Sequence, residues 1–424
     1  MFLLLATACT EGPGPVADEP APAPAGSPAP LPGGGAPVDA PRATDALCQL
    51  DMRCDVLPTR DTKVPCTLRV TREDGRVDFD GAAEMWVRGR SSAQVVKPGY
   101  GVELRGDDGA TTAADLLEMG KESDWVIDGL WYDRLLVRDK LGYDLFRELG
   151  GGNYAAESAL CELTRNGEYY GVHALVERVK RDDDRIDIAD GTDDGAAFVL
   201  TQLDEDCFYT NTLTYGCWKL VSPGTPTADG AAAITAWLAG WEAEVVDAAA
   251  SGAWDEVWRL TELDSVVDVV IVEELFKNED AWYTSLKAYK PEDGGLRFVP
   301  WDLDMTFGQF PGYGTYGESD VWIHYRPLLW QIFAASPAVR ARLPQRWEEL
   351  RRGPLEETTL LAHIDALQAI LGDAIVRNDE RWPIEAIDYA GLFYPVGSYA
   401  EEDDHVRAWL GERLRWMDEH IDAY

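Results

Sequence analysis

The chain has 424 residues, which is enough for one large or two ordinary domains. Apolar residues make up 46% of it, and with 16 Trp and 17 Tyr they can form a sizeable core. Its 38 Lys and Arg stand against 76 Asp and Glu, a net charge of -38. A surface this negative repels nucleic acid and anionic membranes, so a nucleic-acid partner is excluded. The charge by itself otherwise indicates no more than good solubility.

The first residues, MFLLLATACTEG, predict export. A short apolar run and small residues precede Cys9, and this pattern resembles the lipobox of an exported bacterial lipoprotein. We therefore expect residues 1–9 to be a signal segment and Cys9 to be lipidated, which would anchor the chain to the cell envelope. No Lys or Arg precedes Cys9, whereas a secretory signal normally begins with a basic stretch, so an ordinary disordered start is the alternative.

Residues 10–46 are expected to be a disordered tether, because they are rich in Pro, Ala and Gly and offer too little apolar surface to fold. The cysteines that follow are even in number, which suits three disulfides outside the cytosol. They are Cys48, Cys54, Cys66, Cys161, Cys207 and Cys217. The sequence leaves their pairing open, although Cys207 and Cys217 could close a short loop. A Cys and His metal site is disfavoured, because no CxxC occurs and the His are scattered.

Residues 47–424 are expected to form one domain in two parts, divided near residue 225. Apolar and polar positions alternate over 65–106, as they do in strands. A helix is predicted from Tyr132 to Leu149, where apolar residues recur at helical spacing and glycines follow. The Asn166–Gly167 pair then predicts a hairpin, because both residues tolerate the positive φ that a tight turn needs.

The second part is predicted to be more helical. A buried helix is expected over Leu263–Asn278, and further helices over 327–350, 358–378 and 402–422. The polar loop NEDAWYTSLKAY carries Asp280, and the strand-like run LRFVPWDLD carries Asp302 and Asp304. Beyond the N-terminus no run of about 18 apolar residues occurs, so no membrane-spanning helix is predicted.

The three carboxylates suit a particular chemistry. A general base needs a carboxylate near a substrate proton, whereas Mg2+ takes one or two carboxylates together with the oxygens of a polyphosphate. In protein kinases a catalytic Asp is followed later in the chain by a metal-binding Asp. Asp280 and Asp302 occur in that order. On the residues alone, an Asp that caps a turn or a helix end is the simpler interpretation.

Five stretches in order carry a family resemblance: VRGRSSAQVVKPGYGVELR, LLVRDKLGYDLFRELG, YYGVHALVERV, NEDAWY and FVPWDLDMTFG, between residues 87 and 308. In these stretches the chain resembles the spore coat protein H (CotH) kinase family of atypical, secreted or surface protein kinases. The resemblance implies an α+β, divergent kinase-like fold with a strand-rich N-terminal lobe and a mainly helical C-terminal lobe. It also implies binding of ATP with Mg2+ or Mn2+, and transfer of the γ-phosphate to Ser or Thr of a protein.

The resemblance implies roles for the carboxylates. Asp280 is expected to accept the proton of the substrate hydroxyl, and Asp302 to hold the metal with Asp304 in support. Where family members carry Asn five residues after the catalytic Asp, this chain has Ser285. A hydroxyl is a poorer metal ligand than an amide carbonyl, so Ser285 is expected to bind the metal with altered affinity.

The nucleotide-binding residues that the resemblance implies are Arg90, Ser91, Ser92, Lys97 and Glu177. The first three belong to the loop RGRSS, expected to lie over the phosphates, and Lys97 would neutralise phosphate charge. Glu177 is expected either to contact the nucleotide or merely to end a strand. Arg88 and Arg138 are weaker candidates for phosphate or structural contacts. Without the resemblance, such cations would be interpreted as solvated or paired with this chain's many acids.

Two other functions stay open on the sequence. Free ATP is scarce outside the cytosol, so the domain could be a catalytically inactive, kinase-like surface module that binds a partner or an envelope polymer. Two carboxylates and a cation could also support a metal-dependent phosphohydrolase. Under the kinase interpretation, the acidic surface favours a basic, Ser-rich acceptor protein. The chain is expected to be a monomer.

Overall fold

The computed structural model describes residues 42–60, 62–203, 206–210, 212–312, 314–324, 326–388 and 390–424. The chain divides after Ala40, and all that follows concerns the unit Pro41–Tyr424. The expected signal segment 1–9 with its Cys9, and most of the expected tether 10–46, lie outside the described residues. Lipid anchoring therefore stays a prediction.

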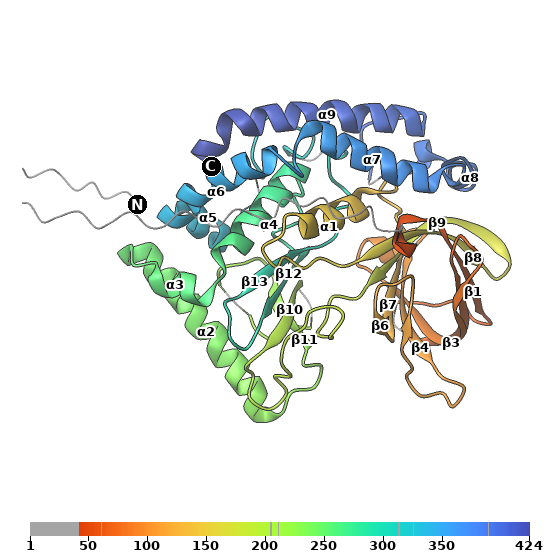
Figure 1. Cartoon of the computed structure of the whole chain (residues 1–424), viewed down its shortest axis with the longest axis horizontal. Helices are drawn as coiled ribbons and strands as arrows, with labels where there is room; N and C mark the ends of the chain where they lie inside the picture. The colour runs from red at the N-terminus through yellow and green to blue at the C-terminus, as the bar shows by residue number, and fades with distance from the viewer. Residues whose placement is uncertain are drawn as a thin grey trace, which may run out of the picture. The chain divides into compact units, whose positions relative to one another are not determined.

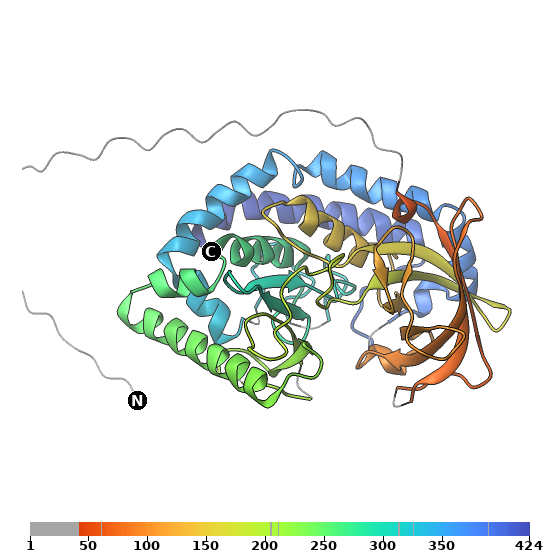
Figure 2. The same cartoon turned by 60° about the horizontal axis from the view of Figure 1, so that its bottom comes forward.

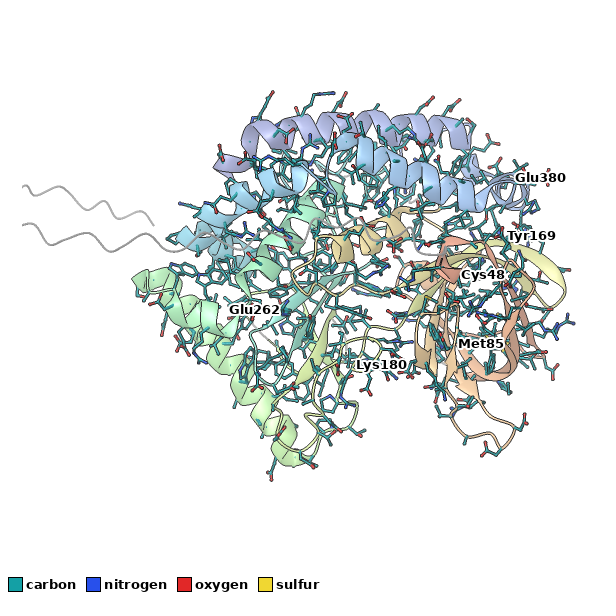
Figure 3. The ribbon with its side chains drawn as sticks, viewed as in Figure 1. Cys48, Met85, Tyr169, Lys180, Glu262 and Glu380 are labelled. Atoms are coloured by element: carbon teal, nitrogen blue, oxygen red, sulfur yellow. A yellow bond between two sulfur atoms is a disulfide. The ribbon has the colours of Figure 1, made fainter. Side chains whose placement is uncertain are left out.

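Seven strands form a closed barrel, coloured red to yellow in Figure 1. In order around the barrel they are β1 (Cys48–Cys54), β2 (Val64–Thr71), β3 (Val77–Arg88), β4 (Gly99–Arg105), β7 (Asp124–Asp128), β9 (Glu168–Glu177) and β8 (Ser158–Arg165). Neighbours are antiparallel except β1 and β8, which are parallel. Alternate side chains of β1 and β2 are buried, because the pleat turns one face toward an apolar interior that includes Met85 (Figure 3).

Three disulfides stabilise the described unit. The pairs are Cys48–Cys161, Cys54–Cys66 and Cys207–Cys217. The first joins β1 to β8 where the barrel closes, and the second joins β1 to β2. The third spans the loop between β10 (Phe198–Leu203) and β11 (Cys217–Ser222). The prediction of three disulfides is confirmed, and the bonds are consistent with an extracellular protein.

A second sheet and the helices make up the rest of the unit. The sheet is antiparallel in the order β11, β10, β12 (Leu286–Lys290), β13 (Arg297–Pro300). A two-residue ribbon pairs β5 (Ala114–Asp115) with β6 (Lys121–Glu122). The α-helices are α1 (Arg138–Glu148), α2 (Ala228–Ser251), α3 (Asp255–Leu260), α4 (Leu263–Phe276), α5 (Leu328–Ala335), α6 (Pro337–Arg351), α7 (Glu357–Leu371), α8 (Ala374–Arg381) and α9 (Tyr399–His420). Figures 1 and 2 show α7 beside α9, and α8 packs against β9 of the barrel.

Helix α4 is the central helix of this part. Every residue from Ser265 to Phe276 is buried, because the run VVDVVIVEELF is apolar nearly all round. It packs against α1, α6, α9 and β13. The helix ends at Lys277, whose left-handed backbone (φ 57°) turns the chain into the loop that carries Asp280.

The expected kinase-like arrangement, with a strand-rich lobe and a mainly helical lobe, is wrong. The first strands close on themselves into a barrel, and the part expected to be mainly helical contains a four-stranded sheet. The expected division near residue 225 falls within that sheet, because β10 and β11 precede it while β12 and β13 follow it. Alternation identifies a strand and its buried face, but it does not identify the strand with which it pairs.

The predicted hairpin turn is confirmed, whereas two of the predicted helices are each interrupted and form two helices. Asn166 and Gly167 have positive φ, 51° and 84°, and turn β8 into β9 as predicted. The helix expected over 327–350 is instead two helices, because Ser336 caps α6 and Pro337 occupies its first turn. The helix expected over 358–378 breaks into α7 and α8, which are bent by 72°. In the described part of the chain no single helix is long and apolar enough to cross a membrane, although this bent pair meets those criteria jointly.

Candidate functional site

The WDLD segment forms a tight loop directly after β13. Asp302 has a φ of 64°, which is uncommon for a residue other than glycine. The Tyr143 hydroxyl accepts from the Asp302 N–H (3.1 Å), and Asp139 Oδ1 accepts from the Leu303 N–H (2.6 Å). The Asn278 amide donates to the Asp302 carbonyl (3.2 Å). Because Asp139 and Tyr143 lie one turn apart on α1, that helix sets the position of the loop.

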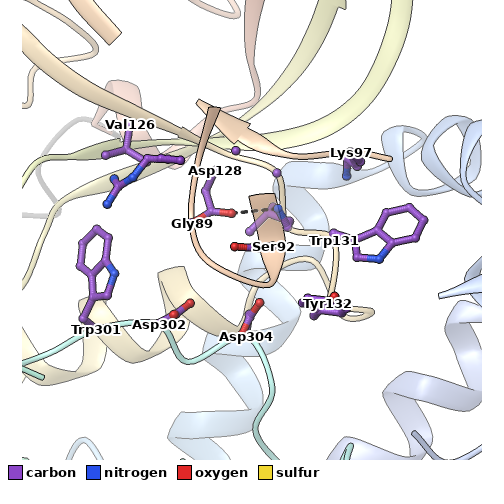
Figure 4. A pocket seen from close by; sticks show the side chains of 14 residues that line it. Gly89, Ser92, Lys97, Val126, Asp128, Trp131, Tyr132, Trp301, Asp302 and Asp304 are labelled. Carbon is purple, nitrogen blue, oxygen red and sulfur yellow. Dashed lines mark hydrogen bonds between the residues drawn. The ribbon is translucent and has the colours of Figure 1, made fainter. Parts of the chain in front are cut away.

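The loop forms one wall of a pocket with an empty volume of about 520 Å³, including space open to solvent. Its enclosed part is about 70 Å³, which accommodates a few waters, a cation or a phosphate group. The pocket is lined by Arg88, Gly89, Ser92, Lys97, Gly99, Val126, Asp128, Gly129, Leu130, Trp131, Tyr132, Trp301, Asp302 and Asp304. In Figure 4 the carboxylates of Asp128, Asp302 and Asp304 and the hydroxyl of Ser92 point toward the same space.

The carboxylates in the pocket raise one another's pKa. Asp302 is exposed to solvent on one side, but the protein around it removes much of the hydration of its carboxylate. This loss, followed by the charges of Asp128 and Asp280, raises the pKa of Asp302 to about 7. Burial, and then the charges of Asp302 and Asp139, raise the pKa of Asp304 well above its ordinary value. A cation in the pocket would relieve this repulsion.

Asp280 lies in the turn that follows α4, and its carbonyl accepts from the Tyr283 N–H (3.0 Å). Burial raises the pKa of its carboxyl, the Arg90 guanidinium opposes this rise, and Glu279 adds to it. Asp280 is not among the residues that line the pocket, but its charge acts on Asp302. The carboxylates expected to be catalytic and metal-binding are therefore within electrostatic reach of each other.

Cations gather around Trp301, beside these carboxylates. Arg88 Cζ lies 5.7 Å and Lys287 Nζ 4.5 Å from the centroid of the Trp301 ring. Lys287 is mostly buried on β12 and donates to Thr201 Oγ1 (3.1 Å). Burial, and then the charge of Arg88, lower the pKa of Lys287 to about 7, against the charge of Asp302. The site thus combines cations suited to phosphate with carboxylates suited to a metal.

The loop after β3 brings two of the predicted phosphate-binding residues to the pocket. Ser92 and Lys97 line it, whereas Arg90 and Ser91 are exposed in the loop. Gly89 permits the turn, because a Cβ atom there would lie 2.1 Å from Ser92 Oγ and its φ is +99°. The prediction that this loop covers a ligand therefore has a structural basis, while contact with phosphate stays a prediction.

Lys97 is buried, and its ammonium points to α8. Its Nζ donates to Asn378 Oδ1 (3.2 Å). Burial lowers the pKa of Lys97 to about 7, although Asp128 and Asp133 favour its charged form. An anion in the pocket would favour the charged form further.

Glu177, expected to contact the nucleotide or to end a strand, is outside the pocket lining. It is buried at the end of β9, where its Oε2 accepts from the Glu157 N–H (2.8 Å) and the Tyr154 hydroxyl (3.3 Å). Arg185 Nε lies 3.6 Å from Oε1. Burial raises the pKa of Glu177 to about 7, although the Glu157 amide and Arg185 favour its ionised form. Its position favours the second of the two roles.

Replacing Glu177 by glutamine is expected to flatten the pH dependence of stability. A glutamate in the unfolded chain loses its proton near pH ~4.3, whereas folded Glu177 keeps its proton to about pH 7. The folded state is therefore destabilised as the pH rises across this window, by up to about 3 kcal/mol. Urea unfolding at about pH 4.5 and about pH 7.5 should show a larger loss for the wild type than for Glu177→Gln. Parallel losses would contradict the raised pKa.

Ser285 and Arg138 are also outside the pocket lining. Ser285 is buried, its N–H donates to the Asp280 carbonyl (3.4 Å), and its hydroxyl has no hydrogen-bond partner among the described residues. Arg138 is fully buried at the start of α1, 2.8 Å from Asp133 and 2.5 Å from Glu402. Arg138 therefore has the structural role, and the metal-binding role of Ser285 stays a prediction.

Sequence patterns miss two residues of this site. Asp128 ends β7 in DWVIDG, an Asp between an apolar strand and a glycine. The WDLD segment likewise has an Asp directly after an apolar strand, so the same pattern could have identified Asp128. Lys287 offers no such signal, because all of β12 is buried and only its pairing with β10 and β13 places the side chain. Arg88, a weaker candidate, does line the pocket.

The pocket residues fit a metal that arrives with a polyphosphate. In the described ranges no three His, Cys, Asp or Glu side chains lie close enough together to hold a metal by themselves. Mg2+, however, is commonly bound by one or two carboxylates and completed by water and phosphate oxygens. Asp302 and Asp304 can supply such carboxylates. Burial and then the charges of neighbouring carboxylates raise their pKa values, and a cation would offset the repulsion between these charges.

A pocket with clustered carboxylates, neighbouring cations and a Gly- and Ser-containing loop is typical of a kinase-like protein. Residues 85–417 match the family model described as CotH kinase protein. The chain therefore belongs to the CotH kinase family, and the resemblance carried by the five stretches is confirmed. No curated protein matches the chain.

Proposed function

We propose that the chain is an ATP- and Mg2+-dependent kinase that transfers the γ-phosphate to Ser or Thr of an acceptor protein. The observation that carries the proposal is the pocket in which Asp302 and Asp304 lie near Arg88, with Asp280 within electrostatic reach. Phosphoryl transfer asks little covalent chemistry of the protein and depends mainly on positioning and charge neutralisation. Such a pocket can supply both.

In this proposal Asp280 accepts the proton of the acceptor hydroxyl. A general base works best when its pKa approaches the operating pH, and burial raises the pKa of Asp280 from its ordinary value. The charge of Arg90 opposes this rise and so favours the ionised form, which can accept a proton. Asp280 is a proton acceptor whose strength is set by its surroundings.

Asp302 and Asp304 would hold the metal, and Arg88 and Ser92 would contact the phosphates. Lys97, whose ammonium is bonded to Asn378, would neutralise phosphate charge without direct contact. Mg2+, when bound, would neutralise phosphate charge as it does in other kinases. The Arg88 guanidinium lies over the ring of Trp301, and its positive charge interacts with the carboxylates of Asp128 and Asp302. The nucleotide would thus be oriented with its phosphate charge neutralised by the metal and by the cationic side chains.

Removing the Asp302 carboxylate is expected to abolish transfer. The full chain, with its disulfides formed, is incubated with γ-labelled ATP and Mg2+ or Mn2+, and label on the chain or on an added basic, Ser-rich protein is counted. Asp302→Ala should lower labelling by about 100-fold or more, since loss of a metal ligand costs several kcal/mol of charge stabilisation. The matched control Asp404→Ala, an exposed carboxylate on α9, should leave labelling unchanged. Full labelling by Asp302→Ala would contradict the proposal.

A catalytically inactive binding module is the second candidate, and Ser285 favours it. The family's Asn is absent at this position, and the Ser285 hydroxyl is buried outside the pocket lining. This candidate predicts binding without label on any protein. A metal-dependent phosphohydrolase would instead release phosphate from ATP without labelled protein. Counting released phosphate beside labelled protein in the same assay therefore separates the three functions.

The proposal includes export and lipid anchoring through Cys9. The three disulfides support a location outside the cytosol, where such bonds persist. Acylation of Cys9 rests on the sequence pattern alone.

A further inference from the structure

Lys287 is a buried lysine with few partners. The residue lies on β12 and is 9% exposed, and its Nζ donates to the hydroxyl of Thr201 (3.1 Å). Lys97, which is also buried, donates to an amide oxygen, and Lys290 donates to three carbonyls. Among the buried cations of the described ranges, Lys287 alone has only a hydroxyl to offset the cost of its burial. The remaining buried cations form ion pairs, and they are Arg134, Arg138, Lys140, Arg185, Lys277 and Arg413.

Arg88 is a second cation that has no carboxylate partner. It ends β3 and is half-buried, and within the part of the chain that the structure describes its guanidinium has neither a hydrogen bond nor an ion pair. Arg88 Cζ and Lys287 Nζ lie 5.7 Å and 4.5 Å from the centroid of the Trp301 ring. The charge of Arg88 acts on Lys287, and the two repel each other. An anion beside the ring would replace this repulsion by attraction to both cations.

The two cations adjoin the pocket of the proposed metal ligands. Arg88 and Trp301 line that pocket together with Asp302, and Figure 4 shows Trp301 next to Asp302. The charge of Asp302 acts on Arg88 and on Lys287, but Asp302 forms an ion pair with neither among the described residues. A metal bound to Asp302 would neutralise this carboxylate. The two cations would then need an anion from a ligand.

The dimensions of the pocket indicate what that anion is. The enclosed part, about 70 Å³, has room for a phosphate group, so a longer phosphate chain must extend beyond it. Next to Trp301 the chain would meet cations. Arg178, directly after β9, adds positive charge there, because it acts on both cations and lies 3.6 Å from Asp124, which is closer to Lys180 (2.7 Å). The net charge of -38 repels free polyanions, so a polyphosphate would bind together with its metal.

We propose that Lys287 and Arg88 form a second phosphate subsite beside Trp301, which binds the part of a polyphosphate chain that extends beyond the enclosed part of the pocket. This inference rests on the proposed function, because it names the part of the phosphate donor that these residues recognise. A nucleoside triphosphate and an inorganic polyphosphate share this group. Lys287 is a binding residue for the donor and does not accept the proton of the acceptor.

The test measures binding, so that it does not depend on transfer. The full chain, with its disulfides formed, is titrated in a calorimeter with tripolyphosphate and Mg2+, and separately with orthophosphate and Mg2+. Lys287→Met should weaken tripolyphosphate binding about ten- to hundredfold, as expected for the loss of a hydrogen bond between charged groups, and should leave orthophosphate binding unchanged. Lys121→Met is the matched control, because Lys121 is exposed on β6 and has no ion pair among the described residues. It should bind both ligands as the wild type does.

Thermal melts of the ligand-free protein separate a binding role of Lys287 from a structural one. Methionine keeps the length of the side chain and removes a buried charge that has one neutral partner, so Lys287→Met should melt no lower than the wild type. ATP, titrated beside tripolyphosphate, identifies the source of the phosphate chain. Equal affinities show that the phosphate chain alone is recognised, whereas tighter binding of ATP shows that the nucleoside contributes. In both cases Lys287→Met must weaken binding.

Three results would overturn the inference. In the first, the wild type does not bind tripolyphosphate. In the second, Lys287→Met binds tripolyphosphate as tightly as the wild type, and in the third it loses affinity for orthophosphate to the same extent. A chain that labels protein but shows one of these results is a kinase without this subsite. A chain that labels nothing but loses tripolyphosphate affinity in Lys287→Met keeps the subsite, and the proposed function fails.

Discussion

Replacing Asp280 by asparagine is expected to lower the rate of phosphate transfer by about 10²- to 10⁴-fold, because the amide cannot accept the hydroxyl proton. Asparagine keeps the size of the side chain and leaves the turn made by the Asp280 carbonyl intact. Asp280 does not line the pocket, so the affinity for nucleotide should change little. Single-turnover transfer of labelled phosphate measures the first quantity, and equilibrium nucleotide titration measures the second.

The pH dependence of transfer gives an independent check on Asp280. A base is active when it is deprotonated, so the rate should fall as the pH drops through its pKa. Since burial raises that pKa, the acidic limb should lie above the ordinary value for aspartate. Asp404→Asn, at an exposed position on α9, should keep both rate and profile. An Asp280→Asn variant with the wild-type rate would exclude Asp280 as the base.

Replacing Arg138 by methionine is expected to lower the free energy of unfolding by about 3–5 kcal/mol, because it leaves two buried carboxylates without their shared cation. Arg138, Asp133 and Glu402 are fully buried, and the guanidinium is bonded to both acids. Glu402 keeps the nearby Arg134, 3.2 Å away, but Asp133 loses its nearest cation. Urea unfolding with intact disulfides measures the change.

The control for Arg138 is a surface pair of the same kind. Arg352 is paired with Glu348 on α6, and both side chains are about two-thirds exposed. Arg352→Met should change the free energy of unfolding by no more than about 1 kcal/mol, since exposed pairs contribute little. The double change Arg138→Met/Asp133→Asn should recover part of the lost stability, because it removes the buried charge that is left without a cation. An Arg138→Met protein as stable as the wild type would show that the pair is dispensable.

Part of the candidate site follows from local sequence. The WDLD signal, an Asp after an apolar strand, identifies Asp302 and Asp304, and both line the pocket. The RGRSS loop contributes Ser92 for a similarly local reason, the glycine that permits its turn. Local sequence does not identify the roles of Arg138 and Glu177. Both residue types could bind a ligand, but both side chains are buried and bonded within the protein, Arg138 to Glu402 and Glu177 to the Glu157 amide.

The sequence by itself determined the elements that depend on nearby residues: the hairpin at Asn166–Gly167, the buried helix α4, the number of disulfides and the family. The tertiary structure alone decided that the barrel closes, because β1 and β8 pair in parallel across Cys48–Cys161, 113 residues apart. It alone brought Lys287 beside Asp302. Side-chain periodicity reports which face of an element is buried, whereas the partner of that face is set by long-range packing that no local pattern encodes.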